Sequence, residues 1–177
     1  AVEVFPEDGV AKRLRVTMGQ PCLERAEIPM AGPQGRAIDE ELRIAVAGEG
    51  TVVLRFAAVS MGNPHCVIYV DDVDDAPVRE LGPLVESHPA FPNRVNVEFI
   101  QLLSRDRLRQ RTWERGTGET LACGTGAVSA AGRRRRLLNR NSRATRLTTR
   151  RRCGMCLGKS DGHDRRSRGA TCCSYCR

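Results

Sequence analysis

The chain has 177 residues, enough for one domain or two small ones, and a formal net charge of +8. Taken as a whole, that charge would indicate a nucleic-acid or anionic-surface partner. Its distribution removes this argument, because residues 1–132 hold 14 Lys or Arg and 19 Asp or Glu, whereas residues 133–177 hold 15 and 2. The basicity belongs to the tail alone. No signal peptide or transmembrane stretch is visible, so we expect a cytoplasmic protein without membrane contact.

The cysteines divide the chain at the same place. Cys22, Cys66 and Cys123 lie far apart in the first 132 residues, and five more crowd residues 153–176. Three scattered cysteines do not form a disulfide framework, so we expect reduced thiols in this part of the chain. The sequence starts at Ala1 in the middle of a pattern, and we expect its natural N-terminus to lie further upstream.

Short strands dominate the first elements of the chain. Alternating apolar and polar residues predict strands near residues 14–17 and 42–46, and a β-rich run predicts another at residues 51–59, after a Gly48-Glu49-Gly50 turn. Residues 66–70 are apolar throughout, which is typical of a strand buried on both faces.

A helix and a further strand follow. Asp74, Asp75 and Pro77 supply helix-start chemistry before apolar residues at helical spacing over residues 78–85, with a break possible at Pro83. Over residues 95–99 the alternation predicts a strand whose valines and phenylalanine face inward and whose Asn96 faces the other way. Small residues at 127–131 predict a second helix. The fold class is therefore mixed α/β.

The segment from Trp113 to Gly126 carries the most informative chemistry. Cys123 lies between a glycine-rich loop and a helix start, where backbone N–H groups can hold a carboxylate and where a thiol ionises more readily. A buried, inert cysteine is the competing interpretation. Upstream, Asn63 and His65 lie in a turn ahead of a buried strand. From the residues alone we favour an ordinary exposed histidine there over one that acts on a nearby thiol.

Taken together, several motifs resemble a known family. They are Met61-Gly62-Asn63-Pro64-His65, the stretch from Leu81-Gly82-Pro83 to Pro92, Arg94-Val95-Asn96-Val97-Glu98-Phe99, and the Trp113 to Gly126 segment. In this order they are similar to the second half of diaminopimelate epimerase, over about residues 1–132.

The resemblance implies a cofactor-independent isomerase that interconverts LL- and meso-diaminopimelate in lysine and peptidoglycan biosynthesis. Two pseudo-symmetric α/β domains each supply one cysteine. One thiolate removes the α-proton while the other thiol protonates the opposite face, which explains the need for two cysteines. The resemblance implies no cofactor and no metal, and it leaves a homodimer open.

The same resemblance assigns roles to individual residues. Cys123 would be a catalytic cysteine, and His65 and Glu114 would adjust the pKa of the thiols. The substrate-binding residues would be Asn63, Asn96, Glu114, Arg115, Gly124 and Thr125, the last two at the carboxylate of the reacting centre.

The chain departs from the family pattern at both ends. The family's other catalytic cysteine, in a Cys-Gly-Asn-Gly motif, has no counterpart among these residues. We therefore expect residues 1–57 to be a remnant of the N-terminal domain and residues 58–132 to be the C-terminal domain with Cys123. The molecule would be an inactive or nearly inactive fragment.

The tail, residues 133–177, has two interpretations. Cys153-x2-Cys156 and Cys173-x2-Cys176 have the spacing of a zinc ribbon, which with the arginines would describe a nucleic-acid-binding module. Alternatively, a shift of reading frame has replaced the family's C-terminal strands by sequence that should be disordered. We favour the frameshift and so expect no nucleic-acid partner. A related isomerase acting on another amino acid also remains as an alternative function.

Overall fold

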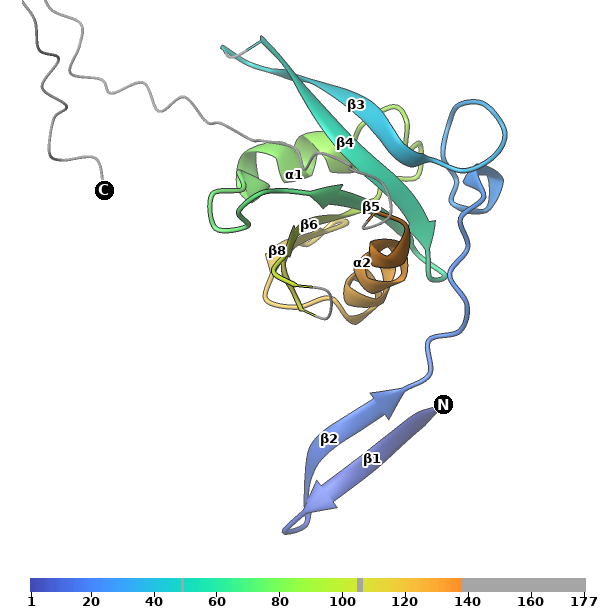
Figure 1. Ribbon diagram of the computed structural model, residues 1–177, viewed down its shortest axis with the longest axis vertical. Helices are drawn as coiled ribbons and strands as arrows, with labels where there is room; N and C mark the ends of the chain where they lie inside the picture. Colours follow the sequence, from blue (N-terminus) through green and yellow to red (C-terminus); the bar gives the residue numbers. More distant parts are fainter. Residues whose placement is uncertain (49, 105–106, 138–177) are drawn as a thin grey trace, which may run out of the picture.

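The computed structural model describes residues 1–48, 50–104 and 107–137, drawn in colour in Figure 1. The expectations of a zinc ribbon, a frameshift and disorder therefore concern residues that lie, from 138 onward, outside this part. Within it, the elements are β1 (Val2–Glu7), β2 (Val10–Val16), the 3-10 turn η1 (Arg25–Glu27), β3 (Ile38–Val46), β4 (Gly50–Ser60), β5 (Pro64–Tyr69), α1 (Val78–Glu86), β6 (Asn96–Leu102), β7 (Leu108–Glu114), β8 (Gly118–Thr120) and α2 (Gly124–Leu137). The predicted mixed α/β class is confirmed.

A six-stranded sheet forms the body of the structure. Its strands lie in chain order, β3-β4-β5-β6-β7-β8, and all neighbours are antiparallel except β5 and β6. A parallel pair needs a crossover connection, and α1 lies in that connection. The parallel register sets His65 opposite Asn96 and Val67 opposite Glu98. Side chains from distant parts of the sequence thereby come to lie side by side on adjacent strands.

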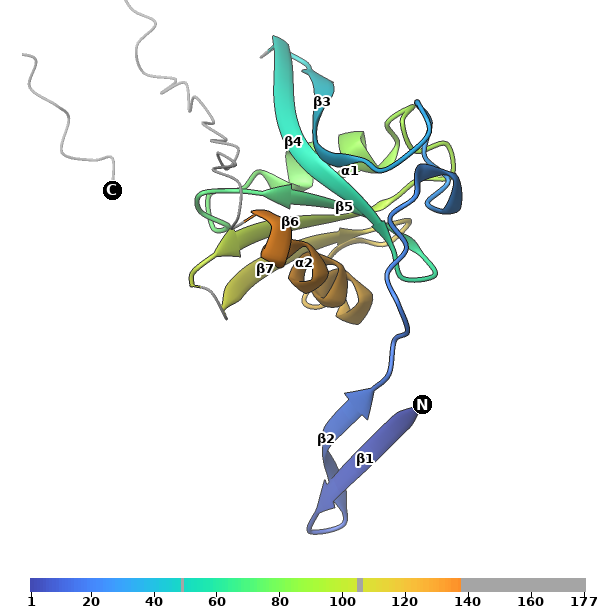
Figure 2. The ribbon, with the colours of Figure 1, turned by 45° about the vertical axis from the view of Figure 1, so that its right-hand side comes forward.

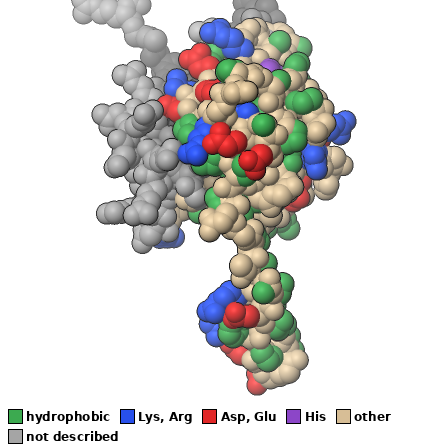
Figure 3. All heavy atoms as spheres, turned by 90° about the vertical axis from the view of Figure 1, so that its right-hand side faces the viewer, with side chains coloured by type: hydrophobic (Ala, Val, Ile, Leu, Met, Phe, Trp, Pro, Cys, Tyr) green, Lys and Arg blue, Asp and Glu red, His purple; other side chains and the backbone are tan. Residues whose placement is uncertain are grey.

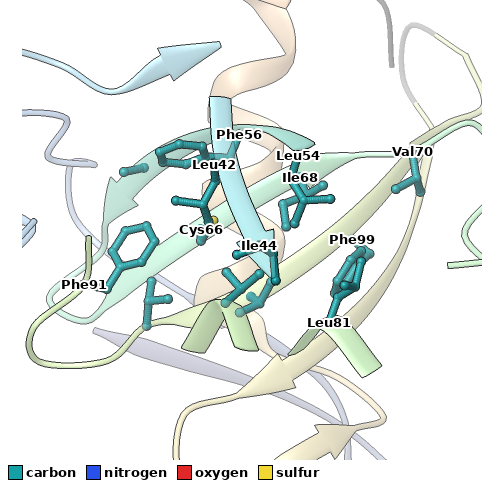
Figure 4. Close-up of a cluster of buried hydrophobic side chains, with 14 of the residues drawn as sticks. Leu42, Ile44, Leu54, Phe56, Cys66, Ile68, Val70, Leu81, Phe91 and Phe99 are labelled. Carbon is teal, nitrogen blue, oxygen red and sulfur yellow. The ribbon is translucent and has the colours of Figure 1, made fainter. Parts of the chain in front are cut away.

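The two helices cover opposite faces of this sheet, as the two ribbon views show (Figures 1 and 2). Because side chains alternate along a strand, each strand divides its residues between them. The face towards α1 carries the larger apolar core, drawn in Figure 4, which includes Cys66, Ile68, Val97, Phe99 and Leu81. The face towards α2 has a smaller apolar cluster made of Val59, Val67, Ile100 and Ala130. The α2 side of the sheet is therefore less completely filled by apolar side chains and also carries polar ones, such as His65 and Glu98.

The regular elements follow the sequence patterns closely, with differences in and before helix α1. The strands expected near residues 14–17, 42–46, 51–59, 66–70 and 95–99 are all present, and Asn96 faces away from Val97 as predicted. Helix α1 continues through Pro83 without a break. Asp74 does not cap it, because its carboxylate binds Arg109 instead, with N–O distances of 2.7 and 2.8 Å.

The first hairpin extends from this body. Strands β1 and β2 pair only with each other and are exposed along their whole length, and Figure 3 shows that the hairpin carries both hydrophobic and charged side chains. The predicted domain boundary between residues 57 and 58 lies inside β4, which pairs with both β3 and β5. The second predicted boundary, after residue 132, lies inside α2. The division into two pseudo-symmetric domains stays a prediction.

No helix in the described ranges combines the length and the apolar character that a membrane crossing requires.

Candidate active site

Cys123 lies at the start of α2. Its carbonyl oxygen accepts the first i to i+4 hydrogen bond of the helix, from the N–H of Ala127 at 3.0 Å. Its sulfur accepts a hydrogen bond from the N–H of Gly126 at 3.4 Å and lies 3.4 Å from the hydroxyl of Thr125. The sulfur therefore lies at the positive end of the helix dipole, beside one N–H donor and one hydroxyl group that can either donate or accept.

Beneath Cys123 lies a buried pair formed by His65 on β5 and Glu98 on β6. The Nδ1 atom of His65 is 2.8 Å from the Oε1 atom of Glu98, and both side chains are fully excluded from solvent. The other ring nitrogen, Nε2, is 3.0 Å from the amide oxygen of Asn63. The amide nitrogen of Asn63 donates to the hydroxyl of Thr125 at 3.3 Å. A continuous set of contacts thus joins the buried pair to Cys123.

The burial of His65 corrects the interpretation that we favoured from the residues alone. That interpretation was an ordinary exposed histidine in a turn, but β5 already begins at Pro64 and the His65 side chain is 0% exposed. The reason is the second helix. Since α2 covers this side of the sheet, a side chain that faces α2 is buried even when its residue is the second of the strand.

A second group of predicted residues meets at the ends of β6 and β7. Asn96 donates through its amide nitrogen to the Pro64 carbonyl oxygen at 3.0 Å and accepts the backbone N–H of Arg115 at 2.9 Å. Arg115 donates from its guanidinium to the Asn93 carbonyl oxygen at 3.0 Å. Glu114 accepts the hydroxyl proton of Thr120 at 2.6 Å. Within the described ranges, neither Glu114 nor Arg115 is hydrogen-bonded to Cys123.

Glu86, at the end of α1, holds the loop that carries Glu114 and Arg115. Its carboxylate accepts the indole N–H of Trp113 at 2.7 Å and the backbone N–H of Gly116 at 2.9 Å, and it is 7% exposed. Sequence reasoning missed this residue, since a glutamate at a helix end resembles a solvated surface group.

Removing the Glu86 carboxylate should weaken the structure. In Glu86→Met the indole N–H of Trp113, the N–H of Gly116 and the Arg94 guanidinium lose their acceptor. A buried donor without a partner is costly, so we expect the free energy of unfolding to fall by about 1.5 kcal/mol. Glu86→Gln keeps one acceptor oxygen and should lose less. Urea unfolding followed by the fluorescence of the single tryptophan, Trp113, measures both variants. Equal losses in the two variants would contradict this role for the carboxylate.

Glu98 is a buried acid with an unusual environment. Burial raises its pKa above the ordinary value for glutamate, the hydrogen bond with His65 opposes this, and the negative charge of Glu114 adds to the rise. Its second oxygen, Oε2, is buried without a hydrogen-bond partner among the described residues. Both observations favour the protonated carboxyl group at this position.

The raised pKa of Glu98 gives a pH dependence with a definite sign. An acid whose pKa is higher in the folded state binds more protons there, so its stabilising contribution is lost as the pH rises from the unfolded pKa through the folded pKa. Glu98→Gln removes this titration. We therefore expect the stability of Glu98→Gln relative to the unchanged chain to increase between about pH 4 and about pH 7. Urea titrations of both proteins at the two pH values check this, and a constant difference would contradict it.

His65, Glu98 and Cys123 also approach the geometry of a metal site, because their ligand-type atoms lie within 4.8 Å of one another. Both ring nitrogens of His65 already have partners, however, at Glu98 and Asn63. A metal ion would have to displace one of these contacts. The arrangement is better described as a hydrogen-bonded network than as a set of ligands.

The other two cysteines of the described ranges have different surroundings. Cys66 is fully buried on the α1 side of the sheet, and burial raises the pKa of its thiol well above the usual value. Cys22 donates from its thiol to a Glu27 carboxylate oxygen at 3.1 Å, and this hydrogen bond raises the pKa of the thiol. Neither thiol shares the helix-start environment of Cys123.

Comparison with known proteins agrees with the motifs. The family described as Diaminopimelate epimerase matches residues 57–150, just over half of the chain. A diaminopimelate epimerase of Pelotomaculum thermopropionicum is 56% identical over 128 residues, which are 72% of this chain and 44% of the relative. The enzyme of Moorella thermoacetica is 58% identical over 125 residues (71% and 43%), and that of Bacillus cereus is 51% identical over 128 residues (72% and 43%).

The chain spans less than half the length of these curated relatives. The matched region nevertheless contains Asn63, His65, Asn96 and the segment around Cys123 in one continuous range. On the family match and on identities above one half, the chain belongs to the diaminopimelate epimerase family.

Proposed function

We propose that this chain takes part in the epimerisation of diaminopimelate, with Cys123 as one of two proton-transfer groups. The observation that carries the proposal is the position of Cys123 at the start of α2, where its sulfur accepts the N–H of Gly126 and lies 3.4 Å from the hydroxyl of Thr125. A thiolate held in this way can accept a proton from the carbon next to a carboxylate. That is the step an epimerase without a cofactor must perform.

The substrate is proposed to lie over the same helix start. Gly124 and Thr125 precede the first bonded N–H of α2, so their own N–H groups are suited to the carboxylate at the reacting carbon. Fixed N–H dipoles there would also stabilise the negative charge that develops when the α-proton leaves. Asn63, Asn96, Glu114 and Arg115 are proposed as the remaining substrate-binding residues, and His65 and Glu114 as groups that adjust thiol protonation.

The opposing proton-transfer group is proposed to lie outside the described residues. Inverting a stereocentre requires an acid and a base on opposite sides of the carbon, and neither Cys22 nor Cys66 has a suitable environment. The described residues therefore supply one side of the reaction. Removal and return of a proton on that side exchanges it with solvent without inverting the centre. The proposal includes a cytoplasmic location and catalysis without a cofactor.

Proton exchange tests the proposal. We expect the full chain, incubated in D2O with LL-diaminopimelate, to exchange the α-proton while retaining configuration, as followed by proton NMR and chiral chromatography. L-Lysine, which lacks the second amino-carboxylate centre, serves as the comparison substrate and should exchange far more slowly. Absence of both exchange and binding with diaminopimelate would refute the proposal, and equal exchange of lysine would favour an isomerase for another amino acid.

A further inference from the structure

The buried carboxyl group of Glu98 has no place in the proposed reaction, although a series of hydrogen bonds connects it to the sulfur of Cys123. This series, the Glu98–Cys123 network, consists of Glu98, His65, Asn63, Thr125 and Cys123. Its successive distances are 2.8, 3.0, 3.3 and 3.4 Å. It joins β6, β5, the turn before β5 and the start of α2.

The direction of these hydrogen bonds follows from the amide of Asn63. Its nitrogen donates to the hydroxyl oxygen of Thr125, so its oxygen faces Nε2 of His65. An amide oxygen can only accept, and Nε2 must therefore carry a hydrogen. Having accepted from Asn63, Thr125 keeps its own hydroxyl proton for the sulfur. Every donor from His65 onward is thus directed towards Cys123, and the N–H of Gly126 adds another.

The same argument fixes the number of protons on the buried pair. With a hydrogen on Nε2, the 2.8 Å contact between Nδ1 of His65 and Glu98 needs a second hydrogen, on either the carboxyl group or the ring. The pair therefore holds two protons and is neutral overall. The partnerless Oε2 atom favours the form with the second hydrogen on the carboxyl group, since a full carboxylate charge would leave that atom unsatisfied in a fully buried place.

The opposite arrangement would have a different consequence. If the Asn63 amide were turned over, its nitrogen would donate to an Nε2 atom without hydrogen, and its oxygen would accept the Thr125 hydroxyl proton. Thr125 could then only accept from Cys123, which suits a thiol. The hydrogen-bond direction and the proton count of the Glu98–His65 pair are therefore tied to the form of Cys123 that the site favours.

We propose that Glu98 is a positioning residue of the Cys123 site. It holds His65 with hydrogen on Nε2, so that the hydrogen bonds of the Glu98–Cys123 network donate in the direction of Cys123 and favour its thiolate. The catalytic role of that thiolate rests on the proposed function, whereas the direction of the hydrogen bonds in the Glu98–Cys123 network is a property of the substrate-free protein. The titratable groups around Glu98 are His65 and Cys66 on β5, Glu114 on β7 and Cys123 at the start of α2.

Nitrogen-15 NMR of the histidine rings tests the direction in the unchanged protein. The chain has three histidines, His65, His88 and His163, so His88→Gln and His163→Gln identify the His65 signals. We expect Nε2 of His65 to be protonated at neutral pH. An Nε2 atom without hydrogen would overturn the proposal, and this result does not depend on whether any variant of Glu98 folds.

Alkylation of Cys123 by iodoacetamide tests the effect on the thiol. Cys123 is the only cysteine of the tryptic peptide 116–133, and Cys22 is the only cysteine of peptide 16–25, which provides an internal control. In Glu98→Gln the new amide can donate to Nδ1 and keep hydrogen on Nε2, so its alkylation rate near neutral pH should stay within about twofold of the unchanged chain. In Glu98→Met the contact is lost, and the rate should fall about tenfold, with a pH profile displaced upward.

The two variants together decide the matter. An unchanged profile in Glu98→Met, or a Glu98→Gln profile displaced as far as that of Glu98→Met, would overturn the proposal. If the Cys22 peptide changed in parallel, the effect would be one of general unfolding, and that result too would count against a positioning role. None of these measurements uses a substrate, so their failure is distinguishable from failure of the proposed function.

Discussion

Replacing Cys123 by serine is expected to slow the exchange of the diaminopimelate α-proton by about 1,000-fold, within the range that a positioned general base contributes. A hydroxyl group is a far weaker acid than a thiol, so serine has almost no anion available near neutral pH to remove the proton. The donors at this position, the Gly126 N–H and the Thr125 hydroxyl, would remain in place. The variant therefore changes the base and little else.

Cys22→Ser provides the matched control for this experiment. Cys22 is also a partly buried thiol with a hydrogen-bond partner, but that partner is Glu27, and the residue has no part in the proposed site. Its substitution should leave exchange unchanged. Exchange that survives Cys123→Ser at the original rate would remove Cys123 from the reaction.

The sequence predicts the elements of this site better than their assembly. Alternation over residues 95–99 indicates a strand with Asn96 facing away from the apolar core, and the glycine-rich segment indicates a helix start at Cys123. Both features are local, because they depend on side-chain periodicity and on backbone freedom. The structure contains both.

The long-range features could not be predicted in the same way. The burial of His65 depends on α2 covering one face of the sheet, and its contact with Glu98 depends on the parallel register of β5 and β6. Neither follows from the residues adjacent to His65. The sequence did contain one signal for Glu98. It alternates with the apolar residues Val97 and Phe99, which places it on the same side of the strand as Asn96. Such a pattern also fits a strand with one solvated face, which is why this residue was missed.

The α2 face of the sheet combines two requirements. A polar network must be dry enough to keep its hydrogen bonds in one direction, yet Cys123 must remain accessible. The partly buried thiol lies at the rim, and the groups behind it become more buried towards Glu98. Close contact between α2 and the sheet is what keeps water from these groups, and this contact depends on a residue without a side chain.

That residue is Gly126, and Gly126→Ala is expected to destabilise the fold by about 3 kcal/mol, at the upper end for overpacking. A Cβ atom there would lie 2.6 Å from Oε1 of Glu98, 3.0 Å from its Cγ and 3.1 Å from Nε2 of Gln110. Glu98 cannot yield cheaply, because the same oxygen contacts His65 and the side chain is fully buried. The helix must therefore move away from the sheet, or the Glu98–His65 contact must break.

Gly124→Ala, two positions earlier in the same helix turn, separates this effect from any general cost of alanine. Its Cβ would approach only the terminal methyl group of Met18, at 3.1 Å, and a methionine end can move aside. We expect its unfolding free energy to change by less than about 0.5 kcal/mol. Urea unfolding followed by Trp113 fluorescence measures both variants. Equal losses would show that the tight contact at Gly126 is not what holds α2 against Glu98. The expected difference would show that the close approach of α2 to Glu98 depends on the missing side chain of Gly126.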